Sequence, residues 1–211
     1  MKKFYNLILL DESGSMETIR QSALSAINET LQTIKKVQKE NNEFEHSISF
    51  VTFSGNGTEG VKFVRFNTPA DAMDELTLED YLPDGCTPLY DAIGTSVEAL
   101  QKLTTKEDVV LVSIITDGME NSSHKFTGTQ IRIMIDRQKE QGWTFTYMGA
   151  NQDSKAVAGK IGIRNTMDFI ASDAGMVKLK AQYCTCFSSF AKVNDGTIIV
   201  EDGAFFTDNE D

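Results

Sequence analysis

The hydrophobic and polar positions of the chain alternate between two patterns. Continuous apolar runs are typical of strands covered on both faces of a parallel sheet, and apolar residues three and four positions apart are typical of helices. The strand-like runs are "FYNLILL", "HSISFVTFS", "VKFVRF", "DVVLVSIITD", "WTFTYMG" and "TMDFIA". Helices are predicted at about residues 16–40, 89–103, 130–141, 154–162 and 174–191. Strands and helices therefore follow one another along most of the chain.

This alternation predicts an α/β fold, with a doubly wound, mostly parallel six-stranded sheet and helices on both faces. Only the turn "GNGTEG" separates the second and third runs, so these form a hairpin that adds one antiparallel edge strand. We expect one domain over residues 1–192 and an acidic C-terminal extension over residues 193–211. In the extension, "TIIV" and "GAFF" flank "EDG", which favours a short hairpin or a disordered end, with a partner-docking segment as the alternative.

Composition argues against some classes of binding partner and indicates the cellular compartment. The 211 residues carry a net charge of −11, which argues against nucleic-acid binding and against an anionic membrane surface. The apolar runs are too short to span a bilayer, and the N-terminal run is too short for a signal peptide. The odd count of 3 cysteines suggests reduced thiols. We therefore expect a cytoplasmic protein.

Two acids stand where buried strands end. Asp11 follows "LILL", and Asp117 follows "SIIT". Ligands of open α/β sheets bind beyond the carboxyl ends of the strands, and a carboxylate buried without a partner is costly. Acids also cap helices at such positions, so the two aspartates alone leave both interpretations open.

Hydroxyl residues favour a metal site. Ser13 and Ser15 alternate with Asp11, and Thr87 lies in the loop "DGCTPLYD" before a helix. Carboxylate and hydroxyl oxygens suit Mg²⁺, Mn²⁺ or Ca²⁺ and suit zinc or copper poorly. The predicted metal site comprises Asp11, Ser13, Ser15, Thr87 and Asp117.

These motifs resemble those of the von Willebrand factor A domain. "DESGS" matches the Asp-x-Ser-x-Ser of the family's metal-ion-dependent adhesion site, "CTPLYDAI" its threonine loop, and "IITDGMEN" its second aspartate. The resemblance runs from Phe4 to about Lys192, and "QKEQGWTFTYMGANQDS" is similar to stand-alone bacterial and phage proteins of this fold. It implies that Ser13, Ser15 and Thr87 bind the ion directly, and that Asp11 and Asp117 often act through water.

An ion held in this way is incompletely neutralised and keeps an open position for a carboxylate. The predicted function is metal-dependent recognition of a protein partner through an Asp or Glu side chain, with Mg²⁺ as the expected ion and Mn²⁺ or Ca²⁺ as alternatives. The oligomeric state is left open. The alternative is a structural or scaffold subunit of a bacterial or phage assembly, in which the ion mainly stabilises the fold.

We expect no enzymatic activity. An aspartyl phosphatase would need a second acid where Ser13 stands. The serine nucleophile elbow and the Walker motif are both absent from the sequence. The two histidines are expected to be His46 on the surface and His124 in a solvated loop near Asp117.

Overall fold

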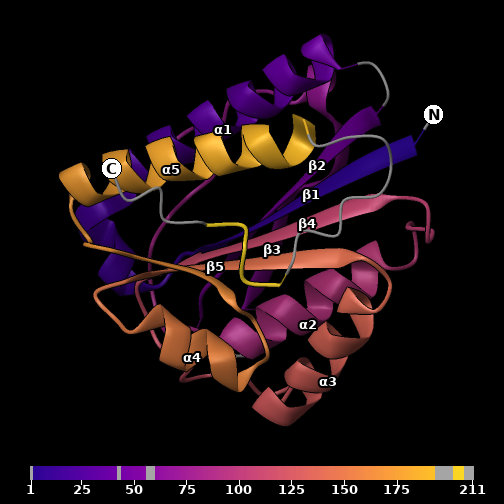
Figure 1. Cartoon of the computed structure of the whole chain (residues 1–211). Helices are drawn as coiled ribbons and strands as arrows, with labels where there is room; N and C mark the ends of the chain where they lie inside the picture. The colour runs from indigo at the N-terminus through magenta and orange to yellow at the C-terminus, as the bar shows by residue number, and fades with distance from the viewer. Residues whose placement is uncertain (1, 42–43, 56–59, 193–201, 207–211) are drawn as a thin grey trace.

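A six-stranded sheet lies between two layers of helices in the computed structural model, which describes residues 2–41, 44–55, 60–192 and 202–206 (Figure 1). The strands are β1 (Lys2–Asp11), β2 (Phe44–Phe53), β3 (Val61–Pro69), β4 (Val109–Thr116), β5 (Trp143–Ala150) and β6 (Asn165–Phe169). The helices are α1 (Arg20–Glu40), α2 (Leu89–Leu100), α3 (Gly128–Lys139), α4 (Ser154–Lys160) and α5 (Asp173–Lys192), with 3-10 helices η1 (Gly14–Ile19) and η2 (Ala70–Ala72).

The strand order is β3-β2-β1-β4-β5-β6. Every neighbouring pair is parallel except β2 and β3, so β3 is an antiparallel edge strand. The predicted doubly wound sheet is therefore confirmed. The chain moves outward from β1 in one direction and from β4 in the other, which places the switch in strand order between β1 and β4.

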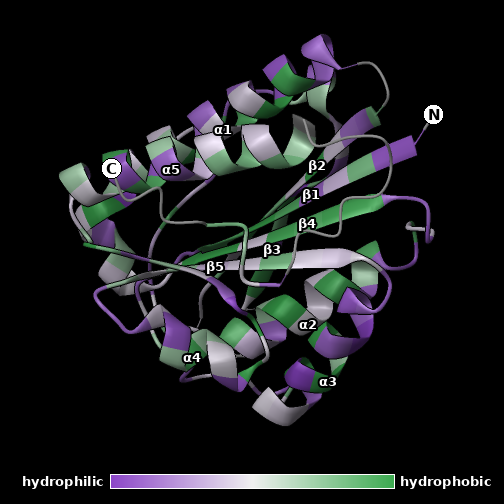
Figure 2. Ribbon diagram, viewed as in Figure 1, coloured by the Kyte–Doolittle hydropathy of each residue, from purple (hydrophilic) through white to green (hydrophobic). Residues whose placement is uncertain are grey.

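Each face of the sheet has its own apolar core. Helices α1 and α5 lie side by side over one face, and α2, α3 and α4 cover the other (Figure 1). Alternate residues of β1 enter the two cores because successive strand side chains point to opposite faces, so Leu10 packs toward α1 and Leu9 toward α2. The central strand β4 is accordingly hydrophobic along most of its length (Figure 2).

The helix predicted from residue 16 begins differently. Residues Gly14–Ile19 form the 3-10 helix η1, and α1 starts only at Arg20. Ser13 occupies the N-cap position of η1 in an extended conformation, but its side chain makes no capping bond. Its hydroxyl instead lies 3.2 Å from that of Ser15. The serines thus contact one another at the start of η1, which replaces the first turn of the α-helix predicted from residue 16.

The prediction of a surface position for His46 is wrong. Its side chain is 2% exposed, and its ring stacks on Phe4 with the centroids 4.6 Å apart. Phe44 and Phe187 pack around the same ring of Phe4. His46 is the third residue of β2, and the helix α5 that covers it is far away in the sequence, so its local pattern could not reveal the burial.

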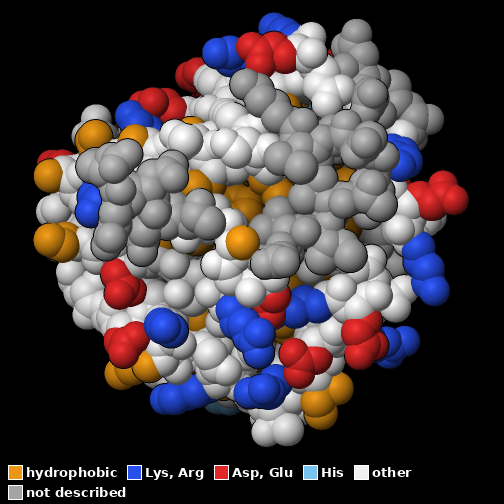
Figure 3. All heavy atoms as spheres, viewed as in Figure 1, with side chains coloured by type: hydrophobic (Ala, Val, Ile, Leu, Met, Phe, Trp, Pro, Cys, Tyr) orange, Lys and Arg blue, Asp and Glu red, His pale blue; other side chains and the backbone are white. Residues whose placement is uncertain are grey.

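Part of the C-terminal extension packs against the fold. "TIIV" lies outside the described residues, and residues 202–206 form a turn that buries Phe205 against Tyr183 and Phe190. Figure 3 shows basic and acidic side chains interspersed over the region of α3 and α4, and Asp202 pairs with Lys139 of α3 at 2.9 Å. This segment is fixed to the start of the edge strand β6, because the backbone N–H groups of Gly203 and Phe205 donate to Asn165 Oδ1.

Within the described ranges, no helix combines the length and the apolar character that crossing a bilayer would require.

Candidate metal centre

The predicted acids meet at the switch point of the sheet. Asp11 ends β1, and Asp117 follows Thr116, the last residue of the neighbouring strand β4. The two strands are parallel, with Leu10 opposite Ile115, so their carboxyl ends open into the same space. This is the edge of the sheet at which ligands of open α/β folds bind.

A chain of hydrogen bonds joins the acids through the two serines. The Ser13 backbone N–H donates to Asp11 Oδ1 at 2.8 Å, and the Ser13 and Ser15 hydroxyls are 3.2 Å apart. The Ser15 hydroxyl donates to Asp117 Oδ1 at 2.7 Å. Hydrogen bonds therefore link four of the five predicted residues, in the order Asp11, Ser13, Ser15 and Asp117.

Thr87 enters from a different loop. A Cβ atom placed on Gly118 would lie 2.7 Å from Thr87 Oγ1 and 3.4 Å from Asp11 Oδ2. The threonine hydroxyl and the aspartate oxygen thus both adjoin the backbone of Gly118. The structure brings all five predicted residues together, and any side chain at residue 118 would crowd the threonine hydroxyl.

The acids differ in exposure. Asp11 is fully buried, Asp117 is half-buried and Ser15 is exposed, so the centre opens to solvent on the Ser15 side. Burial raises the pKa of Asp11 to about 6, and the charge of Asp117 adds to this, while hydrogen bonds from Thr116 and Ser13 oppose it. Burial also raises the pKa of Asp117, against the hydrogen bond from Ser15. Neither carboxylate is well compensated by the protein.

The donor set fits a hard divalent cation. Among the described residues, no lysine, arginine or histidine forms an ion pair with Asp11 or Asp117. A buried carboxylate without a cation is unfavourable, and an ion beside it would supply the missing charge. The same part of the chain holds no group of three or more His, Cys, Asp or Glu side chains suited to a metal, so hydroxyl oxygens would complete the coordination. Ligation by the five residues stays a prediction.

Several supporting residues were not anticipated from the sequence. Thr116 donates its hydroxyl to Asp11 Oδ2, and the hydroxyl of the buried Tyr81 donates to the Asp11 carbonyl at 2.7 Å. Thr116 stands directly before the "DG" of the motif and could have been inferred from its position at the strand end. Tyr81 carries no such signal, because it is 70 residues away in a loop without regular structure.

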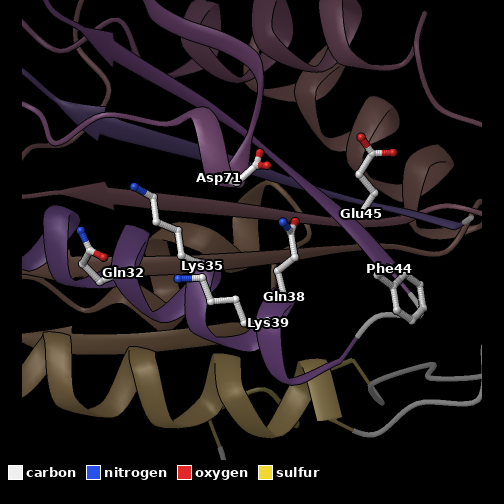
Figure 4. Close-up of a pocket in the computed structure, with 7 residues that line it drawn as sticks. All are labelled: Gln32, Lys35, Gln38, Lys39, Phe44, Glu45 and Asp71. Carbon is white, nitrogen blue, oxygen red and sulfur yellow. The ribbon is translucent and has the colours of Figure 1, made fainter.

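A separate hollow lies beside the C-terminal half of α1 (Figure 4). It is lined by Gln32, Lys35, Gln38, Lys39, Phe44, Glu45 and Asp71. Two of these side chains serve the fold, since Gln38 accepts the His46 backbone N–H and Lys35 donates to the Met73 carbonyl. The hollow includes none of the predicted metal ligands, and we assign it no function.

Solved structures share this fold. One is proximal thread matrix protein 1 from the mussel byssus, in a structure whose metal-ion-dependent adhesion site (MIDAS) motif is occupied by zinc. It is 18% identical in sequence, with a TM-score of 0.59, and the match covers 85% of this chain and 46% of that chain. A von Willebrand factor type A protein from Catenulispora acidiphila is 14% identical in sequence, with a TM-score of 0.58, and the match covers 90% of this chain and 43% of that chain. The chain thus spans less than half the length of both proteins. At these identities the likeness shows the fold alone.

A single-domain structure gives a similar result over nearly its whole length. The SpRpn10 VWA domain is 12% identical with a TM-score of 0.56, over 83% of this chain and 92% of that chain. No curated protein sequence matches the chain. The family model of the von Willebrand factor type A domain matches residues 7–182, and because this span is most of the 211 residues, the chain belongs to that family.

Proposed function

We propose that the chain is a metal-dependent protein-binding module of the adhesion-site type. One Mg²⁺ ion, replaceable by Mn²⁺ or Ca²⁺, would be held by Asp11, Ser13, Ser15, Thr87 and Asp117, and a partner's Asp or Glu carboxylate would complete its coordination. The observation that carries the proposal is the convergence of three loops at the switch point, where hydroxyls and two uncompensated carboxylates face one another. The mussel protein with a zinc-occupied MIDAS motif supports metal binding by this fold.

The chemistry of these residues favours recognition over catalysis. The Ser13 hydroxyl contacts the Ser15 hydroxyl, which donates to Asp117, and among the described residues no histidine or carboxylate hydrogen-bonds to the Ser13 hydroxyl itself. The net charge of −11 favours a protein partner over nucleic acid or an anionic membrane, and the odd count of 3 cysteines favours a reducing, cytoplasmic location. We therefore propose a binding protein and no enzymatic activity.

Calorimetry tests the metal site. Titration with Mg²⁺ or Mn²⁺ is expected to show about one site, and the double variant Asp11→Ala/Asp117→Ala is expected to lose binding, because the remaining oxygens are neutral. Asp71→Ala removes an exposed carboxylate from the distant hollow and serves as the matched control. Metal affinity in the double variant equal to that of the wild type would rule the site out.

The partner class is tested with acidic peptides. A peptide library carrying Asp or Glu is compared with the same sequences carrying Asn or Gln, with Mg²⁺ and with chelator. Recognition predicts binding of the acidic series in Mg²⁺ only, with the fold unchanged in chelator.

A structural or scaffold role for the ion, in a bacterial or phage assembly, predicts a different result. Chelator would then lower the melting temperature, and acidic peptides would not bind in either condition.

A further inference from the structure

The N-terminus of α2 is capped by another part of the chain. Pro88 occupies the N-cap position and makes no side-chain capping bond. The Tyr90 backbone N–H donates to Glu120 Oε2 at 2.8 Å, and the Asp91 backbone N–H donates to Ser123 Oγ at 3.0 Å. Since the first N–H groups of a helix have no partner within the helix, residues 120–123 supply acceptors that the local sequence lacks.

The same segment holds Thr87 at both backbone groups. The Thr87 N–H donates to Asn121 Oδ1 at 2.8 Å, and the Asn121 N–H donates to the Thr87 carbonyl at 3.2 Å. Thr87 is only 2% exposed, so water cannot easily replace these partners. The pair of bonds sets the position of Thr87 along its loop.

The segment is itself held in place. Asp91 accepts hydrogen bonds from the backbone N–H groups of His124, Lys125 and Phe126, at 2.8–2.9 Å. Glu120 accepts from the backbone of Ser122 and Ser123. Hydrogen bonds therefore run in both directions between the start of α2 and the loop that follows Asp117. They hold the loop that carries Asp117 against the loop that carries Thr87.

We propose that Asn121 is a positioning residue that holds the Thr87 hydroxyl at the metal centre. This inference rests on the proposed function of the site. Asn121 acts through the backbone of Thr87, with no contact to the ion. Its side chain suits the task because the amide oxygen accepts the N–H without adding a further negative charge to a centre with two carboxylates. Without it, Thr87 would have to be ordered when the ion binds, and metal affinity would fall.

Asn121→Ala tests the proposal by Mn²⁺ calorimetry. Loss of a residue that orients a ligand typically weakens metal binding about ten- to hundredfold, and we expect a loss of that order. Ser122→Ala is the matched control, because the Ser122 hydroxyl has no partner among the described residues and its backbone bond to Glu120 is kept. Asn121→Asp retains the acceptor oxygen and is expected to recover most of the affinity.

Two further measurements separate positioning from general stability. The double variant Asn121→Ala/Thr87→Ala is expected to bind Mn²⁺ no more weakly than Thr87→Ala, because both changes remove the same contribution. In the metal-free protein, hydrogen exchange at the Thr87 amide is expected to accelerate in Asn121→Ala and to stay unchanged in Ser122→Ala.

The outcomes distinguish this inference from the proposed function. Unchanged Mn²⁺ affinity in Asn121→Ala, or losses that add in the double variant, would overturn the role of Asn121 while leaving the metal site intact. If the wild-type protein binds no Mn²⁺, the proposed function fails first, and the exchange rate of the Thr87 amide still reports whether Asn121 holds the loop.

Discussion

The two edges of the sheet bury ionisable groups in opposite ways. At the carboxyl edge, Asp11 is buried beside Asp117, receives hydrogen bonds from Thr116 and Ser13, and has a pKa raised to about 6. At the amino edge, where the parallel strands begin, His46 is buried against Phe4, and burial lowers its pKa to about 4. The histidine can remain neutral in its aromatic surroundings, whereas the aspartate is surrounded by oxygens that suit a cation.

This contrast indicates that the amino edge contributes to the stability of the fold and the carboxyl edge to metal binding. The amino edge is closed by aromatic packing, in which Phe187 contacts the rings of Phe4 and His46. The carboxyl edge is built from loops held together by polar contacts and keeps Ser15 exposed. We therefore expect changes at the amino edge to affect stability, and changes at the carboxyl edge to affect metal binding.

The largest effect is expected from Phe187→Ala at the amino edge. Phe187 is fully buried, with its ring 5.8 Å from Phe4 and 6.5 Å from Tyr183. Truncation leaves a cavity, so the free energy of unfolding should fall by about 3–5 kcal/mol, as measured by denaturant unfolding. The affinity for Mg²⁺, measured at a temperature where the variant is folded, should stay within about twofold. A large change in affinity would show that the edges are coupled.

The next effect concerns pH. Because the folded-state pKa of His46 is about 4 against an ordinary value of 6.5, the unfolded chain takes up the proton more readily below pH 6.5. This contribution to stability is therefore present above pH 6.5 and is lost as the pH falls toward 4, by up to roughly 3 kcal/mol.

His46→Phe isolates that contribution from those of the carboxylates. The variant keeps an aromatic ring beside Phe4 and cannot be protonated. Its unfolding free energy should fall less steeply than that of the wild type between pH 6.5 and 4, in denaturant series at matched ionic strength. Parallel curves would mean that His46 is not the source of the pH dependence.

A smaller effect is expected from the metal itself. Mg²⁺ at a hundred times its dissociation constant should raise the free energy of unfolding by about 2.7 kcal/mol, because it binds only the folded state. Asp117→Ala should abolish this increase and should change the metal-free protein by no more than about 1 kcal/mol, the value of one hydrogen bond to Ser15. Asp71→Ala should keep the full increase. A metal-free Asp117→Ala protein that unfolds much more easily would place the carboxyl edge among the elements that stabilise the fold.

Most of the fold could be predicted from local pattern. Continuous apolar runs such as "LILL" identify buried parallel strands, because both faces of such a strand are covered. The turn before β3 identified the antiparallel edge. The start of α1 was less predictable, because Ser13 contacts Ser15 and Ser15 donates to Asp117, and the local pattern of η1 cannot reveal a partner 102 positions away.

The residues of the candidate site also fall into two groups, those that the sequence could reveal and those that only the tertiary structure reveals. Asp11, Ser13 and Ser15 could be grouped from their spacing, Asp117 from its place at a strand end, and Thr87 from its loop before a helix; the resemblance of the motifs then agreed with this set. Asn121 and Tyr81 could not, because one contacts Thr87 and the other contacts Asp11 only once the loops are side by side. His46 was placed wrongly for a related reason, since its burial depends on α5, which packs over it from the far end of the chain.

The sequence by itself determined the alternation of strands and helices, the hydroxyl and carboxylate chemistry at the strand ends, and the absence of enough basic charge to favour nucleic acid. These properties depend on the type and spacing of neighbouring residues. Tertiary structure alone decided that the loop after Asp117 caps α2, that Asn121 bonds to Thr87 across 34 positions, and that Phe205 packs against Tyr183 and Phe190. Such contacts depend on which strands become neighbours in the sheet, and that order is set by the packing of the whole domain and not by local pattern.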